Sequence, residues 1–461
     1  MAQPKRINDD LIDALRDLLG ERLSMAQAVR EQHGHDESYH DGHAPDLVVF
    51  PESTEEVSEI VILCAARDVP VIPFGTGTAL EGGVVALRGG VCIDLGRMDE
   101  IVQLNADDMD VRVQSGVTRK QLNQHLRDTG LFFSIDPGAD ASLGGMTATR
   151  ASGTNAVRYG TMRENVLAMT VVLADGRIIQ TSRRARKSAA GYDLTRLFVG
   201  SEGTLGVITE ITLKLYGIPE AISSAVCPFP DLGAAVGTVI QTIQAGVPVA
   251  RIELMDEVQM QATNAFSKLD YSVQPTLFFE FHGSSAAVVE QAEIAEAIAG
   301  EHGASDFLWA TKSEDRKKLW QARHDSFYAS RALRPGARGM VTDVCVPISR
   351  LAECILETRR DIDDSGLLAP ILGHVGDGNF HVVLLIDMDD EDDIERCKAF
   401  NERLVLRALA MEGTCTGEHG IGLGKIDFLR AEHGEAVSVM RAVKMALDPR
   451  NIMNPGKIVR L

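Results

Sequence analysis

Glycine is distributed unevenly along this chain, and its clusters constrain the fold more than any other feature of the sequence. The 42 glycines among 461 residues are concentrated in five segments: 75–90, 138–160, 191–206, 373–378 and 413–424. Glycine permits positive φ angles and a close approach of the backbone to a neighbour, so dense clusters are typical of turns that surround a ligand. We therefore expect a scaffold of ordinary strands and helices that carries several ligand-facing turns.

The hydrophobic pattern predicts an α+β protein with two main domains. Helical spacing over 55–67 is followed by a short buried strand at 69–74. After Pro219 the glycine clusters thin out, and a strand and helix alternation begins that is typical of a second α+β domain. Further strands are expected within 91–95, 111–113, 169–173, 207–215, 223–229, 250–255 and 276–283, and further helices within 231–245, 285–300, 350–362 and 390–412. The expected domains are 1–219 and 220–425, with a C-terminal segment over 426–461 that returns to the first domain.

Composition and charge exclude several classes of function. A hydrophobic fraction of 45% and a charged fraction of 24% are those of an ordinary globular protein. The net charge of −20 argues against binding to nucleic acid or to anionic lipid. Seven cysteines without a CxxC pair argue against a disulfide framework or a thiolate zinc site. The first residues lack the apolar core of a signal peptide, so a cytoplasmic location is expected.

The first two glycine clusters combine glycine with hydroxyl side chains. PFGTGT begins at Pro73, and LGGMTATRASGTN begins at Leu143. Backbone N–H groups and hydroxyl donors in such turns can form a binding site for a pyrophosphate. Neither a P-loop motif nor the GxGxxG dinucleotide fingerprint occurs, which leaves NAD with little support. The alternative is that these glycines only form tight turns.

Two histidines and a distant Glu-His pair form a candidate metal and base site. His374 and His381 flank Asp377-Gly378, a favoured hairpin turn, and counting outward from it places the two imidazoles directly opposite each other. Glu418 supplies a third ligand, and His2Glu is a known catalytic zinc arrangement that also suits manganese or iron. His419 is then free to act as a base. The alternatives are a packed histidine pair and a structural His419.

Other candidate residues are less specific. A substrate with a carboxylate would need an anchor for that group, and the planar guanidinium of arginine fits it best. The segment 319–339 offers four arginines, Arg323, Arg331, Arg334 and Arg338. The histidines within 33–43 are interpreted as part of a polar loop rather than as a metal site.

Six motifs, in this order along the chain, carry a family resemblance. They are PFGTGT, LGGMTATRASGTNAVRYG, SEGTLGVIT, HVGDGNFH, CTGEHGIG and NPGKI. Over nearly its whole length the chain resembles the flavin-linked oxidoreductases of the vanillyl-alcohol-oxidase type, in particular their FAD-dependent D-2-hydroxyacid dehydrogenase branch. The resemblance implies a two-part FAD-binding domain of the PCMH type and a ferredoxin-like α+β substrate domain. It also implies non-covalent FAD, because 75–83 contains no histidine.

The resemblance further implies a set of site residues. The implied metal ligands are His374, His381 and Glu418, with zinc as the first choice of metal; His419 is the implied base and Arg323 the implied substrate clamp. The implied FAD contacts are Pro73, Gly75, Thr76, Gly77, Thr78, Pro137, Gly138, Gly144, Gly145, Thr147, Ser152, Gly153, Asn155, Tyr159, Gly160, Glu202, Gly206, Ile208 and Asn454.

The implied reaction is oxidation of a D-2-hydroxyacid to a 2-oxo acid by hydride transfer to flavin N5. Thr342 and Val383 stand where 2-hydroxyglutarate enzymes have a lysine and an asparagine, which favours a short uncharged substrate. D-lactate is therefore the first choice, with glycolate and D-2-hydroxyglutarate as alternatives. A non-catalytic flavin subunit and a metal-dependent hydrolase are the rival classes. The implied electron acceptor is a cytochrome, a quinone or an electron-transfer flavoprotein. Such an acceptor could place the protein at the periphery of a membrane. The resemblance is also compatible with a homodimer.

Overall fold

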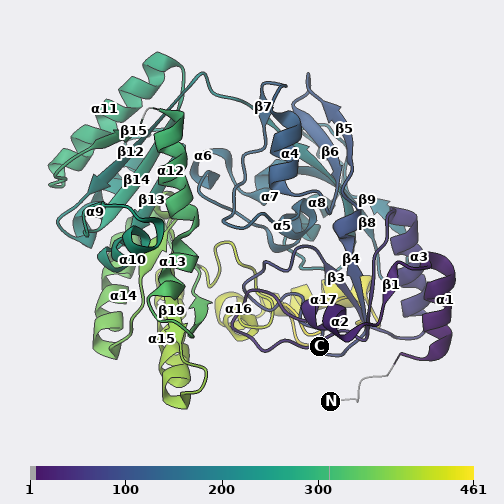
Figure 1. Cartoon of the computed structure of the whole chain (residues 1–461). Coiled ribbons are helices and arrows are strands. Elements are labelled where there is room, and N and C mark those ends of the chain that lie inside the picture. The colour runs from purple at the N-terminus through teal and green to yellow at the C-terminus, as the bar shows by residue number, and fades with distance from the viewer. Residues whose placement is uncertain (1–6, 311) are drawn as a thin grey trace. The chain divides into compact units, whose positions relative to one another are not determined.

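The computed structural model describes residues 7–310 and 312–461 and divides the chain into two units. Unit 1 comprises the residues up to Ser152, Gly160–Ile218 and Glu418–Leu461. Unit 2 comprises Gly153–Tyr159 and Pro219–Gly417. Each unit is therefore assembled from segments that are distant in the sequence (Figure 1).

Unit 1 begins with a four-stranded sheet whose inner strands are parallel. Its order is β1 (Leu23–Ser24), β2 (Leu47–Val49), β4 (Val91–Asp94) and β3 (Val71–Phe74). Three helices accompany this sheet, α1 (Asp9–Leu19), α2 (Gln27–Gln32) and α3 (Thr54–Ala65). The side chain of Ser53 caps α3 by accepting the N–H of Glu56, and the apolar face of α3 is buried. The parallel strands are buried along their length, as expected when both faces of a sheet are covered.

A five-stranded antiparallel sheet forms the second part of unit 1. Its order is β5 (Ile101–Asn105), β6 (Asp110–Gln114), β10 (Val207–Lys214), β8 (Val166–Val172) and β9 (Ile178–Gln180). The remaining elements of this part are the pair β7 (Leu131–Phe132) and β11 (Tyr216–Gly217), the helices α4 (Arg119–Leu126), α5 (Leu143–Thr149), α7 (Met162–Asn165) and α8 (Leu194–Phe198), and the 3-10 turn η1 (Leu95–Arg97). An aliphatic core that includes Val111, Leu143 and Ile211 joins α5 to this sheet.

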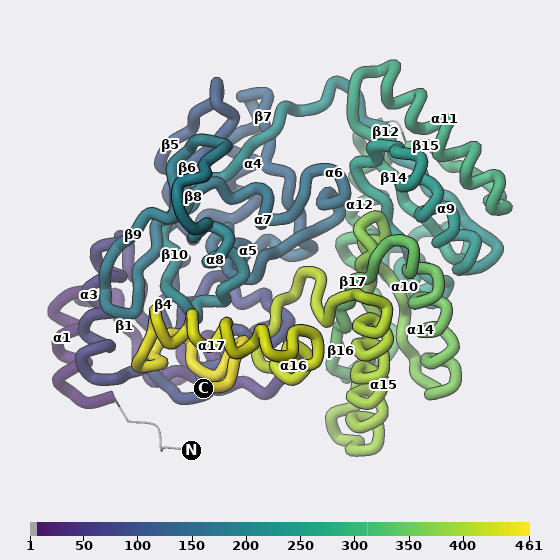
Figure 2. Tube along the Cα trace, turned by 180° about the vertical axis from the view of Figure 1, so that it is seen from behind, coloured from purple at the N-terminus to yellow at the C-terminus, as the bar shows by residue number. Residues whose placement is uncertain are grey.

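The C-terminal segment of unit 1 carries α16 (Ile426–His433) and α17 (Ala436–Leu447). Figure 2 shows this segment, in yellow, running along unit 1, and Met453 pairs with Val71 at the end of β3. The ammonium of Lys444, buried in α17, donates to the carbonyl oxygens of Thr204 (2.7 Å) and Met453 (2.8 Å). These bonds attach the end of the chain to the turn that precedes β10.

Unit 2 is built on an antiparallel sheet of eight strands. Its order is β15 (Leu308–Ala310), β12 (Ala221–Pro228), β14 (Thr276–Gly283), β13 (Arg251–Met255), β18 (Ile371–Gly373), β19 (Asn379–Ile386) and β16 (Arg338–Val341), and β17 (Val344–Cys345) also pairs with β19. Its helices are α6 (Ala156–Tyr159), α9 (Leu232–Gln244), α10 (Glu257–Ser267), α11 (Ser285–Glu301), α12 (Ser313–His324), α13 (Ser326–Ala332), α14 (Leu351–Ser365) and α15 (Glu391–Ala410), with the 3-10 turns η2 (Ile348–Arg350) and η3 (Val375–Asp377). Helices α14 and α15 lie side by side in Figures 1 and 2.

The α+β class and the sheet-rich second part are confirmed, but the predicted hairpin register is wrong. Ile371 pairs with Val382 and Leu372 pairs with His381, so the register differs by two residues from the one expected. The reason is the turn, because η3 adds a 3-10 turn between the strands where a two-residue loop was expected. Extending the observed register places His374 opposite Asn379 and diagonal to His381, a spacing at which long side chains still meet.

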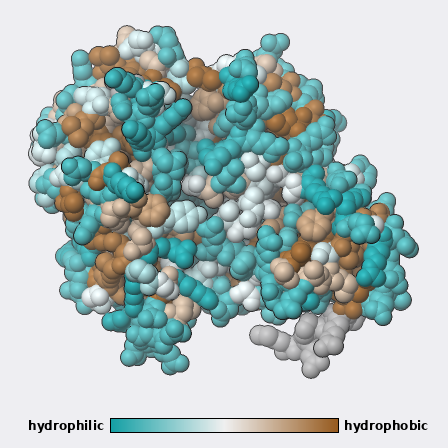
Figure 3. All heavy atoms as spheres, viewed as in Figure 1, coloured by the Kyte–Doolittle hydropathy of each residue, from teal (hydrophilic) through white to brown (hydrophobic). Residues whose placement is uncertain are grey.

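No helix within residues 7–310 and 312–461 is long and apolar enough to cross a membrane. Figure 3 shows one face of the molecule, on which hydrophobic residues occur in small groups among hydrophilic ones.

Candidate active site

The first glycine loop in unit 1 fits a pyrophosphate. It follows β3, and the backbone N–H groups of Thr76, Gly77 and Thr78 donate to no other residue in the described part of the chain. Gly77 has a φ of +68°, and a Cβ there would lie 2.9 Å from the Phe74 ring. A side chain at this position would therefore be strained, and the bare backbone can approach a ligand closely.

The second glycine segment supports the same interpretation. Ser142 caps α5, and a Cβ on Gly144 would lie 2.5 Å from the Cβ of Ser115. Among the described residues, the buried hydroxyls of Ser115 and Ser201 have no hydrogen-bond partner. Such groups cost free energy unless a ligand or water pairs with them. Their position beside the glycine segments fits a bound cofactor with many polar atoms.

Glu202 and Asn454 hold the loops of unit 1 together. The Glu202 carboxylate accepts the N–H groups of Ile421 (2.7 Å) and Gly422 (2.8 Å). The Asn454 amide donates to the carbonyl oxygens of Gly83 (2.9 Å) and Glu202 (2.8 Å). Burial raises the pKa of the Glu202 carboxyl despite its two N–H donors. Both residues thus position backbone segments, whether or not they also contact FAD.

The predicted FAD contacts Gly153, Asn155 and Tyr159 belong to unit 2, and all others belong to unit 1. In unit 2 the Asn155 side chain accepts from Nε of Arg251 (3.0 Å), and the Tyr159 hydroxyl is hydrogen-bonded to Nδ1 of His282 (2.7 Å). Their role in FAD binding stays a prediction.

His374 and His381 are neighbours in unit 2, although they do not face each other across the hairpin. Their ring centroids are 5.5 Å apart with an interplanar angle of 85°. Nδ1 of His374 donates to the carboxylate of Glu253 (2.8 Å), and Nδ1 of His381 donates to the carbonyl oxygen of Thr342 (3.0 Å). An acceptor at Nδ1 fixes the tautomer in which Nε2 carries the lone pair. The donor set therefore fits a divalent metal.

Glu253 was not predicted from the sequence, and it connects two predicted residues. One of its oxygens, Oε2, accepts from Nε (2.9 Å) and Nη2 (2.6 Å) of Arg323, and Oε1 accepts from His374. All three side chains are largely buried. The signal in the sequence is a single acidic residue in the apolar strand RIELM, because a lone buried charge requires partners.

Asp343 supports the second histidine. Its carboxylate accepts from the Asn379 amide (2.8 Å) and the Thr416 hydroxyl (2.7 Å), and it lies 3.7 Å from Nδ1 of His381. The Thr342 hydroxyl accepts the N–H of Val382 (2.9 Å), so this side chain is part of the sheet structure.

Glu418 and His419 follow Gly417 directly, at the point where the chain leaves unit 2. Gly417 is packed so tightly that a Cβ would lie 3.1 Å from Oδ1 of Asp343, the carboxylate beside His381. Consecutive Cα atoms are about 3.8 Å apart. The assignments of Glu418 and His419 stay predictions.

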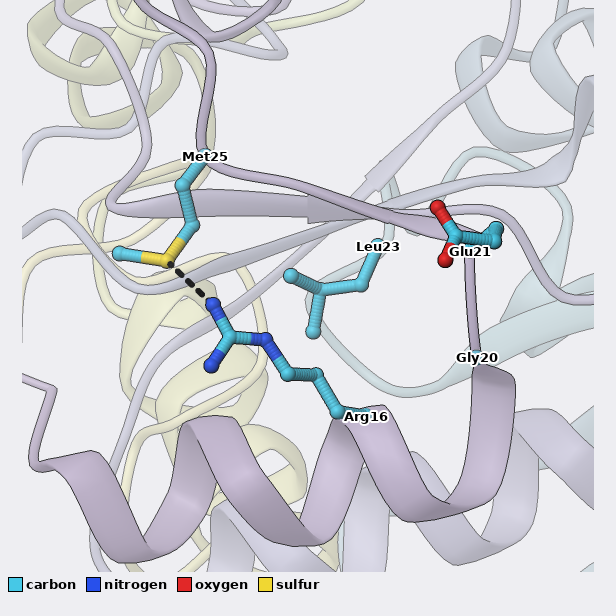
Figure 4. Close-up of a pocket in the computed structure, with 5 residues that line it drawn as sticks. All are labelled: Arg16, Gly20, Glu21, Leu23 and Met25. Atoms are coloured by element: carbon cyan, nitrogen blue, oxygen red, sulfur yellow. Dashed lines mark hydrogen bonds between the residues drawn. The ribbon is translucent and has the colours of Figure 1, made fainter.

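A pocket elsewhere in unit 1 carries none of the predicted site residues (Figure 4). It has a volume of about 280 Å³ and is lined by Arg16, Gly20, Glu21, Leu23 and Met25. Nη2 of Arg16 lies 3.9 Å from the Met25 sulfur across it.

The fold of unit 1 and its glycine-lined loops define an FAD-binding oxidoreductase. A family model described as FAD linked oxidases, C-terminal domain, matches residues 218–458, and one described as FAD binding domain matches residues 45–182. The chain belongs to the family of FAD-linked oxidases.

Curated relatives cover nearly the whole chain. A protein of Danio rerio named "Probable D-lactate dehydrogenase, mitochondrial" is 58% identical over 98% of this chain and 92% of its own length. An Arabidopsis thaliana protein named "D-lactate dehydrogenase [cytochrome], mitochondrial" is 47% identical over 99% of this chain and 81% of its own length. The Bacillus subtilis "Glycolate oxidase subunit GlcD" is 33% identical over 90% of this chain and 89% of its own length.

A solved structure shows the same fold at low sequence identity. The crystal structure of p-cresol methylhydroxylase with substrate bound matches this chain with a TM-score of 0.81 and 17% sequence identity. The match covers 99% of this chain and 98% of the p-cresol methylhydroxylase chain. This likeness confirms the predicted fold class.

Proposed function

We propose that this flavoprotein oxidises D-lactate to pyruvate with the help of a divalent metal. The observation that carries the proposal is the pair His374 and His381, whose Nδ1 atoms are both held by oxygen acceptors while their rings lie 5.5 Å apart. The names of the Danio rerio and Arabidopsis thaliana relatives support the substrate. When bound, FAD supplies a hydride acceptor and the metal supplies positive charge that stabilises a developing alkoxide.

The residues of the chain have separate tasks in this reaction. Arg323 keeps Nε and Nη2 on Glu253 and uses its remaining donors for the substrate carboxylate. His374, His381 and Glu418 hold the metal, with zinc as the first choice and manganese or iron as alternatives. His419 accepts the proton of the substrate hydroxyl on its imidazole.

The environment of Thr342 supports a small substrate. Thr342 is 1% exposed, and its hydroxyl is used by the backbone of β19. No cation is therefore offered at this position for a distal carboxylate, which favours a short substrate. Glycolate is the second candidate, because the Bacillus subtilis relative is named a glycolate oxidase subunit.

A cytochrome is the proposed electron acceptor, because the Arabidopsis thaliana and Saccharomyces cerevisiae relatives carry "[cytochrome]" in their names. The relatives are also named mitochondrial, so the cytoplasmic location stays a prediction without support from them.

Two substitutions test the assignment of roles. Glu418→Gln should lose the metal and the reduction of the flavin by D-lactate while FAD stays bound. His419→Ala should keep the metal and slow flavin reduction by about 10²-fold or more, because general base catalysis is lost. The chain contains a matched control in α16, where Nε2 of His433 lies 3.3 Å from Oε1 of Glu432. Glu432→Gln and His433→Ala should change neither property. A metal-replete and active Glu418→Gln variant would refute the metal assignment.

A further inference from the structure

Two buried Arg-Glu-His groups lie on the sheet of unit 2, and only one of them includes a proposed metal ligand. Arg323, Glu253 and His374 form the first. Arg251, Glu280 and His282 form the second, with Glu280 Oε1 3.5 Å from Nε of Arg251 and 2.9 Å from Nε2 of His282. Glu253 and Glu280 come from the neighbouring strands β13 and β14, where Arg251 pairs with Glu280.

Both oxygens of Glu253 are used by its two partners. Oε2 accepts both donors of Arg323, and Nδ1 of His374 lies 2.8 Å from Oε1 and 3.0 Å from Oε2. Glu253 is fully buried, so no solvent can replace either bond. Only a carboxylate can accept on both sides, since the amide of glutamine accepts on one side and donates on the other.

We propose that Glu253 is a positioning residue that fixes the metal-binding tautomer of His374 and the orientation of Arg323 at the same time. The inference rests on the proposed function, in which His374 holds the metal and Arg323 holds the substrate carboxylate. One buried carboxylate thus connects the metal subsite to the anchor of the substrate.

A glutamine at position 253 should disturb the histidine rather than the arginine. A buried guanidinium without an acceptor is very costly, so the amide oxygen should turn toward Arg323. The amide N–H2 then takes the position of Oε1, the nearer of the two oxygens to Nδ1 of His374. A donor at this position favours the tautomer in which Nδ1 accepts and Nε2 carries the proton. An Nε2 that carries a proton cannot ligate a metal.

The affinity for metal, measured without turnover, tests this directly. The chain is stripped with a chelator and titrated with Zn²⁺, and separately with Mn²⁺, in competition with a chromophoric chelator. Glu253→Gln should bind about 10- to 100-fold more weakly than the unsubstituted chain, as expected when a histidine ligand loses the carboxylate that accepts from its other ring nitrogen. Glu280→Gln, the matched control, should bind within twofold of the unsubstituted chain, although it also breaks a buried Arg-Glu-His group.

Removing the arginine should restore binding. In the double variant Glu253→Gln with Arg323→Met, the amide oxygen is free to accept from His374, so the affinity should rise above that of Glu253→Gln alone. Rescue of this kind is not expected if Glu253 serves only the stability of the sheet.

A second double variant keeps the test valid if Glu253→Gln does not fold. Replacing a buried ion pair with apolar residues is often tolerated, so Glu253→Met with Arg323→Met should fold. It leaves Nδ1 of His374 without an acceptor and should bind metal at least 10-fold more weakly than Arg323→Met alone.

The outcomes distinguish failure of this inference from failure of the proposed function. Equal affinities in the Glu253 variants and their references would overturn this inference alone. An unsubstituted chain that binds neither metal would overturn the metal assignment and this inference with it. Tight, Glu253-dependent binding without reduction of the flavin by D-lactate would support the inference and overturn only the proposed substrate.

Discussion

The carboxylate of Glu202 accepts the backbone N–H of Gly422 at 2.8 Å, although 220 residues separate the two in the chain. Its other oxygen accepts the N–H of Ile421. Glu202 itself has a φ of +50°, a strained value for a residue with a side chain. The loop that begins with Glu418 and His419 is therefore attached to the turn before β10, and the strain is consistent with a functional role.

Glu202→Gln should loosen this loop, because an amide has only one acceptor for two N–H donors. We expect the amides of Ile421 and Gly422 to exchange with deuterium faster in the variant. We also expect flavin reduction to slow by about 10-fold or more, since small misplacements of catalytic groups are costly. Hydrogen exchange with peptide-level mass spectrometry checks the first expectation, and stopped-flow absorbance checks the second.

Glu210→Gln is the control for Glu202. Glu210 lies on β10, is partly exposed, and lies 3.8 Å from Arg112. The Glu210→Gln variant should leave the amide hydrogen exchange of residues 418–424 unchanged. Unchanged exchange in Glu202→Gln as well would show that the two bonds do not hold the loop.

Gly77→Ala should weaken FAD binding by about 10-fold or more, because the residue combines a positive φ with contact to Phe74. Gly130→Ala is matched in φ, at +74°, but a Cβ there has nothing within 4 Å. It should lose some stability without losing FAD. Fluorescence titration of the FAD-free chain with FAD measures both affinities. Equal affinities would remove the first glycine loop from the cofactor site.

We expect His33 to contribute to the stability of the folded protein in a pH-dependent way. Its Nε2 lies 2.8 Å from Oδ2 of Asp94, and its Nδ1 lies 2.7 Å from the carbonyl oxygen of Val29. Burial lowers the pKa of His33, but the hydrogen bonds to Asp94 and Val29 outweigh it and raise the pKa above 6.5. A raised pKa means that the folded state binds the proton more tightly, so this stabilisation is complete below about pH 6.5 and is lost as the pH rises through the folded-state value.

Asp94→Asn should therefore reduce the free energy of unfolding most in acid. The loss should be about 2 kcal/mol near pH 5.5, the usual size for a hydrogen bond to a charged group, and smaller near pH 8.5. Asparagine keeps an acceptor for the N–H of Gly96, so the cap of η1 is preserved. Urea unfolding at both pH values measures the difference, and a loss independent of pH would contradict the assignment.

The fold was largely predictable because the buried strands and amphipathic helices carry local patterns. The segment VPVIPF at 69–74 and the strand TLFFEFHG at 276–283 appear where expected, as β3 and β14. Helices α16 and α17 were not predicted, because they lie between the motifs CTGEHGIG and NPGKI and contain neither. The polar loop expected at 33–43 was only partly right, since His33 is 5% exposed and hydrogen-bonded to Asp94.

The site was less predictable because its geometry depends on turns and on residues between the motifs. The histidine pair was recognised from its spacing, but the η3 turn shifted the hairpin register by two residues. Glu253 and Glu280 lie outside every motif, and only their charge within apolar strands marks them. Which arginine meets which carboxylate depends on how α12 packs on the sheet, and no local pattern contains that information.

The most direct test of the central claim is anaerobic mixing of the FAD- and metal-loaded protein with D-lactate, L-lactate, glycolate and D-2-hydroxyglutarate. Elemental analysis of the same sample gives the metal content. We predict that D-lactate bleaches the flavin absorption fastest, that L-lactate does not, and that removal of the metal abolishes the bleaching. A flavin that stays oxidised with every D-hydroxyacid, or that is bleached equally well without metal, would contradict the account.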